Sequence, residues 1–371
     1  MISSSAHCPT SIVLSMIVKN EAHVLARCLA SVKPLLSAWV IVDTGSTDDT
    51  PAVARAALDG VPGEVIHRPW KNFGHNRSEA LALSRPRADY SLVVDADDNL
   101  EFAPDVRLPE LTHDAYALLV RNNGITYRRL HLLKNSRAWR YDGVLHEYPA
   151  CDGEATRGFL DSVVYVRNHD GARWSDPQKY VKDAAVLEEA LRSEPNNARY
   201  TFYLAQSYRD AKMPGDALRY YEKRTTMPGW DEEAFVAHHE AAKLREHLGE
   251  PFEAVQSAFL RAYEARPRRA EPLCELARFC RLKSRLPLAW IYALAASRIP
   301  RPDDALFVDE AVYAWRSLDE LAVAAYHVGE YEVGRVSNAR LIESGAVPAG
   351  DLPRIRDNLA WCERGLTGKL A

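Results

Sequence analysis

The chain has 371 residues, which is longer than one hydrophobic core normally serves, so the length predicts two or three domains. Its 47 Lys and Arg residues and 51 Asp and Glu residues give a net charge of −4, which favours neither a nucleic acid nor an anionic membrane as a partner. The hydrophobic fraction of 47% is ordinary for a globular protein.

The cysteines and the hydropathy pattern indicate where the protein works. None of the six cysteines forms a C-x-x-C pair, and no histidine stands at zinc spacing from them, so we expect reduced thiols. No apolar run approaches the roughly 18 residues that a membrane span needs. The segment 11–21 also lacks the basic region and cleavage site of a signal peptide. We therefore expect a soluble, cytoplasmic protein without a transmembrane segment.

The first part of the chain alternates between short β-branched runs and amphipathic stretches. The expected strands are 11–18, 38–42, 63–67 and 90–94, and the expected helices are 21–32, 49–58 and 76–84. This alternation predicts an α/β domain with a Rossmann-like, mainly parallel sheet and right-handed connections. Further along, we expect a hairpin of 115–120 and 126–133 with its turn at 121–124, and a closing strand at 159–166.

After about residue 175 the chain consists of nearly continuous helix, which predicts two domains, 1–172 and 173–371. In the second domain, Ala217, Ala254 and Ala289 are 37 and 35 residues apart. This spacing is close to the roughly 34 residues of a tetratricopeptide repeat, a helical hairpin that stacks on its neighbours. We expect three such units, a degenerate fourth at 318–341 and a final helix at 352–364. Helical hairpins of another kind are the alternative.

The strand expected at 90–94 runs directly into an acidic cluster, Asp95-Ala96-Asp97-Asp98. In open α/β sheets, ligands bind at the carboxyl edge where such a strand ends. Two carboxylates one residue apart repel each other unless a cation lies beside them, so the pattern indicates a divalent metal with oxygen ligands. A solvated acidic turn is the alternative.

Two other polar segments precede expected helices. Asp43 follows the strand at 38–42 and should lie at the same sheet edge as Asp95, with Thr47 or Asp48 capping the next helix. The segment 67–77 places Arg77 at a helix N-terminus, where the helix dipole and a guanidinium favour a phosphate. A capped turn is an adequate alternative for the first segment. For the second, the alternative is a surface loop in which Arg77 pairs with Glu79 or Asp89.

Taken together, four segments resemble family 2 glycosyltransferases in order and spacing: 15–21, 42–50, 74–77 and 94–98. The resemblance covers about residues 11–170. With the repeats behind it, the chain is similar to bacterial glycosyltransferases that carry a tetratricopeptide tail, a group that includes peptide S-glycosyltransferases. It implies a GT-A fold, an inverting reaction and a nucleoside diphosphate sugar as donor, with UDP expected as the nucleotide and Mn²⁺ or Mg²⁺ as the metal.

The resemblance also assigns roles to individual residues. It places Asp43 at the nucleobase, and it assigns contacts with the base, ribose or diphosphate to Val18, Asn20, Glu21, Asn76, Arg77 and Asp95. The metal ligands that it implies are Asp95, Asp97 and His169, the last of which follows the closing strand and precedes an Asp-Gly turn.

An inverting transfer also needs a carboxylate that takes the acceptor's proton. The family's usual Glu-Asp motif is absent, and the sequence offers Glu147 in its place, with His146 as an orienting or acceptor-binding group. An exposed turn is the alternative for this pair. Asp98 is the competing base, and Asp142 is a weaker one.

The helical repeats suggest a role in binding. Stacked helix pairs form surfaces for extended segments, so we expect the repeats to hold a peptide or protein acceptor, or a second copy of the chain. Packing between helices explains most of their tyrosines. Two other classes remain open: a degenerate transferase domain that acts as a protein-interaction scaffold, and a sugar nucleotidyltransferase. The nucleotidyltransferase would need a basic, glycine-rich loop near residues 15–21, which the sequence lacks.

Overall fold

The computed structural model describes residues 10–368, apart from 104, 105, 107, 123 and 124. The chain forms two compact units, Met1–Ser193 and Glu194–Ala371. The division therefore falls later than the expected 172/173, because helix α4 (Lys179–Ser193) belongs to the first unit. Asp183 on this helix is nearly buried and pairs with Arg173, which fixes the helix to the segment before it.

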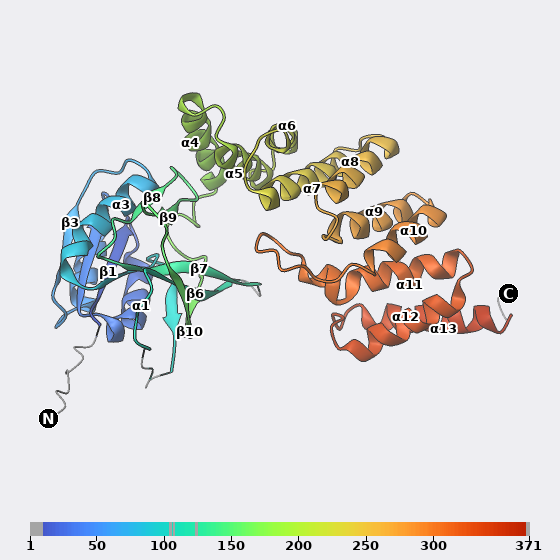
Figure 1. Ribbon diagram of the computed structural model, residues 1–371, viewed down its shortest axis with the longest axis horizontal. Coiled ribbons are helices and arrows are strands. Elements are labelled where there is room, and N and C mark those ends of the chain that lie inside the picture. The colour runs from blue at the N-terminus through green and yellow to red at the C-terminus, as the bar shows by residue number, and fades with distance from the viewer. Residues whose placement is uncertain (1–9, 104–105, 107, 123–124, 369–371) are drawn as a thin grey trace. The chain divides into compact units, whose positions relative to one another are not determined.

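The first unit contains an eight-stranded sheet in the order β3-β2-β1-β4-β7-β6-β10-β5 (Figure 1). Four strands pair in parallel, as the sequence predicts: β1 (Ile12–Val18), β2 (Ala38–Asp43), β3 (Gly63–His67) and β4 (Tyr90–Val93). β1 and β2 are buried along almost their whole length, because helices cover both faces of a parallel sheet. The predicted α/β fold class is confirmed.

The rest of the sheet is mixed. β6 (Ala115–Asn122) and β7 (Ile125–Lys134) form the expected hairpin, whose turn lies outside the described residues at 123 and 124. β7 runs antiparallel to β4, and β10 (Arg157–Val166) runs parallel to β6. Three short strands were not predicted: β5 (Asn99–Glu101) beside β10, and the pair β8 (Arg140–Asp142) and β9 (Tyr148–Ala150).

Besides α4, the helices of this unit are α1 (Ala22–Val32), α2 (Thr50–Ala57) and α3 (Phe73–Ser84), with short 3₁₀ turns at Lys33–Leu35 and Arg85–Arg87. α3 begins three residues earlier than expected. The side chain of Asn72 caps it by accepting a hydrogen bond of 2.8 Å from the backbone N–H of His75. The N-cap of α2 is Asp49 rather than Thr47 or Asp48, although Asp48 accepts a hydrogen bond from Thr50 N–H at 3.0 Å.

The first turn of α3 packs tightly on the segment between β8 and β9. Gly74 lies against the backbone of Gly143, so closely that a Cβ atom at residue 74 would overlap the carbonyl oxygen of Gly143. Gly143 itself has a φ of +110°, which favours glycine. Glycine at both positions therefore lets the segment 141–147 approach the helix that carries Arg77.

The second unit consists of helices (Figure 1). They are α5 (Ala198–Asp210), α6 (Pro214–Thr225), α7 (Asp231–His247), α8 (Phe252–Ala265), α9 (Glu271–Leu282), α10 (Leu286–Ala296), α11 (Ser317–His327), α12 (Tyr331–Ser344) and α13 (Leu352–Leu366), with a π-helical turn at Val312–Arg316. The first eight pair in sequence as helical hairpins, which confirms the tetratricopeptide-like fold. Ala217 and Ala289 are buried where paired helices meet.

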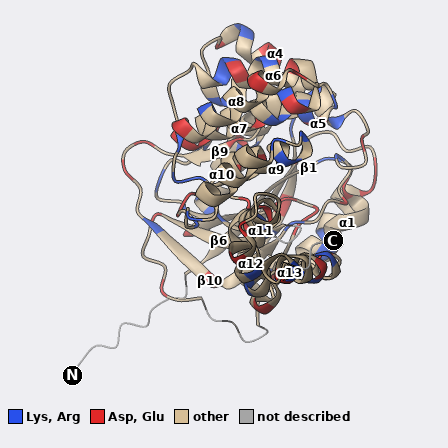
Figure 2. Ribbon diagram, turned by 90° about the vertical axis from the view of Figure 1, so that its right-hand side faces the viewer, with Lys and Arg blue, Asp and Glu red and all other residues tan. Residues whose placement is uncertain are grey.

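Charges of both signs are mixed over the helices rather than gathered in one block (Figure 2). This mixture agrees with the small net charge of −4. In the described part of the chain, no helix is long and apolar enough to cross a bilayer.

Candidate functional site

The predicted site residues gather at one edge of the first unit's sheet. Asp43 is the last residue of β2, and Asp95 follows the end of β4. Both strands are parallel to β1, which lies between them, so their carboxyl ends open at the same edge. In this class of sheet, ligands bind at that edge.

Arg77 forms the centre of the site. From α3, its Nη2 atom donates a hydrogen bond to Asp95 Oδ1, and its Nε atom donates one of 2.6 Å to Glu147 Oε1. The exposed fractions of the Arg77 and Glu147 side chains are only 8% and 7%. Arg77 therefore pairs with two carboxylates of its own chain, and neither Glu79 nor Asp89 is its partner.

Asp95 stays ionised because arginines surround it. Burial alone would raise the pKa of Asp95, but the charges of Arg77, Arg129 and Arg167 outweigh burial and hold that pKa well below its usual range. The sequence analysis did not single out Arg129 or Arg167. Arg129 lies on β7, which carries several charged and polar residues, so the sequence carries no distinct signal for it. The antiparallel pairing of Leu132 with Leu92 places β7 beside β4.

Asp97 differs from Asp95 because no side chain among the described residues donates a hydrogen bond to its carboxylate. Arg27 and Asn168 instead hold its backbone carbonyl, with donor distances of 2.6 and 3.0 Å. The carboxylate lies against Gly171, where a Cβ atom would approach its Oδ2 to 2.8 Å. Burial and then the charge of Asp95 raise the pKa of Asp97. Asp97 is thus a half-buried carboxylate whose oxygens receive no hydrogen bond from a described side chain.

Glu21 lies close to the same segment. Its Oε2 accepts a hydrogen bond of 3.1 Å from the backbone N–H of Ala172, the residue after Gly171. Burial raises the pKa of Glu21 to about 7, and the charge of Asp97 contributes to this shift. Two carboxylates that lie 76 residues apart in the sequence, Glu21 and Asp97, therefore converge on the Gly171–Ala172 backbone.

The structure does not assemble the predicted metal ligands Asp95, Asp97 and His169 into one group. Among the described residues, no three His, Cys, Asp or Glu side chains are placed to hold one ion. His169 shares a hydrogen bond of 2.8 Å between its Nε2 and Asn122 Oδ1, and its ring packs edge-on against Trp174. Burial lowers the pKa of His169, with Arg167 and Lys179 adding to the effect. Its role as a metal ligand stays a prediction.

Asp98 was the competing candidate for the base, and its surroundings argue against that role. It is only 1% exposed, and its Oδ1 accepts a hydrogen bond of 2.8 Å from the backbone N–H of Asn168. Burial, with the charges of Asp95 and Asp97, raises the pKa of Asp98 to about 7. A carboxyl group enclosed in this way joins the acidic segment to the end of β10, and an acceptor does not reach it.

Glu147 and His146 lie between the short strands β8 and β9. His146 is exposed and has a φ of +54°, an uncommon backbone conformation for a residue other than glycine. That turn directs Glu147 inward onto Arg77, while its second carboxylate oxygen, Oε2, receives no hydrogen bond from a described residue. Asp142, the weaker candidate for the base, lies at the surface and forms an ion pair of 3.0 Å with Arg140.

Several residues expected to contact the nucleotide shape the surrounding loops. Asp43 accepts hydrogen bonds from the backbone N–H and hydroxyl of Ser46, at 2.9 and 2.7 Å, and its Oδ2 lies 3.0 Å from the exposed His67. Asn20 Oδ1 accepts a hydrogen bond of 2.7 Å from Thr47 N–H, and the carbonyl of Val18 accepts one of 3.0 Å from Thr44 N–H. These contacts join the end of β1 to the loop that follows β2.

Asn76 has a similar structural role in the loop before α3. It is fully buried, accepts a hydrogen bond of 2.9 Å from Lys71 N–H and donates one of 3.1 Å to Pro69 O. The side chain thereby fixes the loop 69–72 before the helix, and its role at a nucleotide stays a prediction.

Residues 14–117 match the family model "Glycosyl transferase family 2". They form a family 2 glycosyltransferase domain. The resemblance and the class of enzyme predicted from the sequence are confirmed for this glycosyltransferase domain, which contains Arg77 and the acidic segment at Asp95. Arg129, Glu147 and His169 lie beyond the matched residues.

The curated relatives include a protein named for TPR repeats and proteins named as glycosyltransferases. A stretch of 88 residues, 24% of this chain, is 42% identical to a TPR repeat-containing protein of Synechococcus elongatus, of which it covers 20%. Over 229 residues, 59% of this chain, the identity to an uncharacterized glycosyltransferase of Rickettsia felis is 26%, covering 77% of that protein. The glycosyltransferase SunS of Bacillus subtilis is 22% identical over 226 residues, 57% of this chain and 53% of SunS.

The ion pairs of Arg77 lead to a prediction about stability. Replacing Arg77 with Met leaves Asp95 and Glu147 buried without a cation, so we expect a loss of about 3–5 kcal/mol in the free energy of unfolding. Urea denaturation of the purified full chain measures this loss.

The matched control is Arg68→Met, which removes the pair with Glu79, whose side chains are 38% and 30% exposed. A pair this exposed contributes at most about 1 kcal/mol. Equal losses in the two variants would contradict the central role of Arg77.

Proposed function

We propose that this chain transfers a sugar from a nucleoside diphosphate donor, with UDP as the nucleotide, to a peptide acceptor, with inversion and with the help of a divalent cation. The observation that carries the proposal is the family 2 domain whose sheet edge presents Asp43 at the end of β2 and Asp95 and Asp97 beyond β4. A donor at this edge would extend from a nucleobase near Asp43 to a diphosphate near Asp97.

The carboxylates at this edge fit a divalent cation. Asp97 lacks a cationic partner in contact with its carboxylate, and Glu21 approaches the same backbone segment. Mg²⁺ commonly binds one or two protein carboxylates together with substrate phosphates, so a group of three protein ligands is not required. Asp97 would hold the ion, with Glu21 or His169 in support. When bound, the cation supplies Lewis acidity, which neutralises charge on the departing diphosphate.

Arg129 provides a second source of positive charge. It lies near Asp95, Arg77 and Tyr165, yet it forms no hydrogen bond or ion pair with a described residue. Arg77, by contrast, is held between two carboxylates. A guanidinium with free donors binds phosphate oxygens strongly through paired hydrogen bonds. In this proposal Arg129 contacts the diphosphate, and Arg77 positions the carboxylates.

Glu147 is the carboxylate best placed to act as the base. It lies between the short strands β8 and β9, its Oε1 accepts the hydrogen bond of Arg77, and its Oε2 has no donor among the described residues. As the acceptor nucleophile attacks the anomeric carbon, Glu147 takes its proton and the bond from that carbon to the diphosphate oxygen breaks. Attack from the side opposite the leaving group gives inversion.

The role of Asp97 is tested with a donor alone. Hydrolysis of a panel of UDP-sugars is measured with Mn²⁺, with Mg²⁺ and with EDTA. We expect hydrolysis of one donor that needs a cation, and a loss of about 100-fold or more in Asp97→Asn, in keeping with the several kcal/mol that such a cation contributes.

Asp97→Asn should keep the wild-type melting temperature, because no described side chain depends on its carboxylate. Asp161→Asn, which changes an exposed carboxylate on β10, is the control. Hydrolysis at the wild-type rate by Asp97→Asn would contradict the role of Asp97 as a metal ligand.

The role of Glu147 is tested by separating donor binding from transfer. Glu147→Gln retains an oxygen that accepts the hydrogen bond of Arg77, so binding of UDP, measured by calorimetry, should stay within about twofold. Transfer should fall by about 10²–10⁴-fold, the usual contribution of a general base. Asp142→Asn serves as the neighbouring control, and transfer lost equally in both variants would exclude Glu147 as the base.

Arg129 and its neighbour Arg128 form a matched pair of test sites. Arg128 is exposed and pairs with Asp161 at 2.8 Å, whereas Arg129 faces the acidic segment. We expect Arg129→Met to weaken UDP binding by about tenfold and to affect uridine binding little, because only UDP carries the diphosphate. Arg128→Met should leave both affinities unchanged, and an equal effect on uridine and UDP would contradict a phosphate contact.

A further inference from the structure

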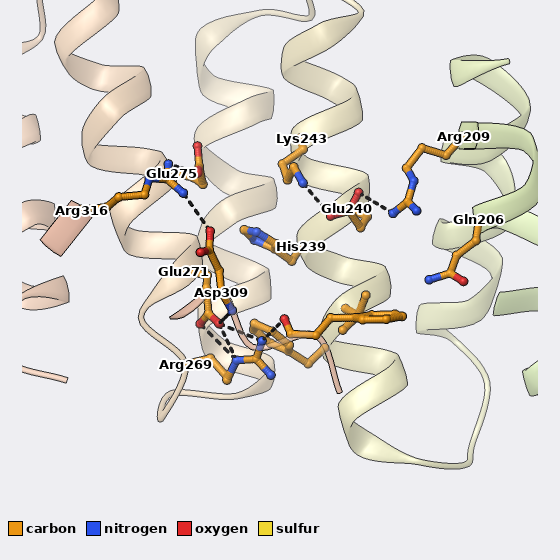
Figure 3. A pocket seen from close by; sticks show the side chains of 13 residues that line it. Gln206, Arg209, His239, Glu240, Lys243, Arg269, Glu271, Glu275, Asp309 and Arg316 are labelled. Carbon is orange, nitrogen blue, oxygen red and sulfur yellow. Dashed lines mark hydrogen bonds and ion pairs between the residues drawn. The ribbon is translucent and has the colours of Figure 1, made fainter. Parts of the chain in front are cut away.

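The repeat unit contains a cavity of about 290 Å³ between α5, α7 and α9 (Figure 3). Each charged side chain of its lining has a partner of opposite charge: Arg209 and Lys243 pair with Glu240, Arg269 pairs with Glu271, and Arg316 pairs with Glu275 and Asp309. These charges therefore stabilise the repeat unit itself, and none of them indicates a ligand. Charges without partners lie elsewhere, on a strand of the first unit.

The first half of strand β10 has an open edge. In the sheet, β10 lies between β6 and β5 (Figure 1), but β5 pairs only with Val164, Tyr165 and Val166 at its far end. No described strand pairs with the outer side of residues 157–163. An open strand edge is a template for pairing with another chain.

The backbone of this stretch directs hydrogen-bonding groups to the open side. The carbonyl of Thr156 faces β6, because it accepts a hydrogen bond of 3.1 Å from the N–H of Ala115. Successive residues of a strand turn their N–H and C=O groups to opposite sides, so Gly158 also faces β6 whereas Arg157 and Phe159 face outward. The outward groups of Arg157 and Phe159 have no partner among the described residues.

The exposed side chains of the same stretch are complementary to one another in charge. Arg157, Phe159 and Asp161 are exposed and alternate with two buried residues. Phe159 is 57% exposed, and the guanidinium of Arg128 lies 4.1 Å from the centre of its ring. Asp161 pairs with Arg128 at 2.8 Å through Oδ1, while its Oδ2 and the whole of Arg157 have no partner among the described residues. A free cation and a free carboxylate oxygen therefore lie on either side of an exposed aromatic ring.

We propose that the open edge of β10 pairs with the same edge of a second copy of this chain, so that one sheet runs through both copies. The two strands lie antiparallel about a twofold axis at Phe159. In that register Phe159 faces its counterpart, and Arg157 of each copy faces Asp161 of the other. Opposite charges and aromatic rings that face each other across two strands stabilise the pairing. Facing residues whose backbone groups point outward exchange two hydrogen bonds.

The order of the charges is what selects a second copy as the partner. Edge strands are commonly protected by like charges, which repel an identical strand. Here the residues two positions before and two positions after Phe159 carry opposite charges, so an antiparallel copy meets a complementary charge at both places. A parallel copy in register would instead place Arg157 against Arg157. The interface is thus isologous, and its short length predicts a weak, reversible dimer.

The pairing leaves the candidate site open. Residues 157–161 form the first half of β10, whereas Asn168 and Gly171, which contact the acidic segment, follow its last residue. Self-association, which the sequence led us to expect from the repeats, is thereby assigned to the sheet of the first unit. It does not depend on the proposed transfer reaction.

The test measures the average mass of the purified full chain by sedimentation over a range of concentrations, without donor or cation. We expect this mass to rise from that of one copy toward that of two. Arg157→Glu and Asp161→Arg each bring like charges face to face, and the twofold axis duplicates each contact. Each variant alone should therefore raise the dissociation constant of the dimer by about tenfold.

Mixing these two variants tests the register. In a mixed dimer, the new acid of Arg157→Glu faces the new base of Asp161→Arg, and the unchanged Asp161 and Arg157 face each other. An equimolar mixture should therefore dimerise as the wild type does, although neither variant does so alone. Arg192→Glu, which makes the same charge change on an exposed residue of α4, is the control and should dimerise normally. Because all these side chains are exposed, the melting temperatures should match that of the wild type.

A cysteine on the axis tests the same geometry independently of charge. The Cα atoms of facing hydrogen-bonded residues in antiparallel strands lie about 5.5 Å apart, within the range that a disulfide spans. Under mild oxidation, Phe159→Cys should yield a covalent dimer. Arg157→Cys should not, since its two copies lie four positions apart along the paired strands. The oxidised wild type measures the background from the native cysteines.

The proposal is overturned by a chain that stays monomeric at every concentration, by a dimer that both charge variants leave unchanged, by a mixture of the two variants that does not dimerise, or by equal cross-linking of Arg157→Cys and Phe159→Cys. Because the mass is measured without transfer, such a failure leaves the proposed reaction standing. Equally, an Asp97→Asn variant without activity should still dimerise, and Arg157→Glu should hydrolyse the donor as the wild type does.

Discussion

The buried ion pairs of Arg77 hold together the part of the molecule on which the site depends. One guanidinium on α3 contacts Asp95 beyond β4 and Glu147 between β8 and β9. Three segments far apart in the sequence are therefore joined by the side chain of one arginine. Both pairs are largely enclosed, and removing the arginine would leave two carboxylates without compensation. The close contact of Gly74 with Gly143 brings the helix and the β8–β9 segment near enough for these bonds to form.

Four carboxylates of the first unit, Asp95, Asp97, Asp98 and Glu21, differ in what surrounds them. Asp95 lies among arginines and is ionised, whereas Asp98 is enclosed beside Asn168 and tends to hold its proton. Burial also raises the pKa of Asp97, and that of Glu21 to about 7, and both side chains are half-buried. Carboxylates that differ this much in environment can take different roles. In the proposed reaction, Asp97 and Glu21 would bind the cation, and Asp95 and Asp98 would hold the end of the sheet in place.

The two units differ in how their polar groups are satisfied. At the sheet edge of the first unit, the Asp97 carboxylate receives no hydrogen bond from a described side chain, although Arg27 and Asn168 hold its backbone carbonyl. In the cavity of the repeat unit the charged side chains pair with one another, while the buried Nδ1 of His239 has no partner among the described residues.

Much of the fold followed from local patterns. β-branched runs separated by amphipathic helices predicted the parallel strands within one or two residues, because side-chain periodicity reports burial directly. The stacked helical hairpins of the second unit were predicted in the same way, from the spacing of their alanines. The three short strands were missed, since three residues give no period to detect. The domain boundary was expected about twenty residues too early because α4 resembles a repeat helix, yet its Asp183 pairs within the first unit.

The sequence by itself determined the family, the fold class and the identity of the acidic segment, because each depends on residues close together in the chain. Only the tertiary structure decided what those residues contact. In the structure, Arg77 pairs with Asp95 and Glu147 and is not free for a phosphate. Asp98 is enclosed, and Arg129 reaches the site from a strand more than thirty residues further along the chain. A side chain's partners depend on which strands lie side by side, and a linear pattern does not record that order.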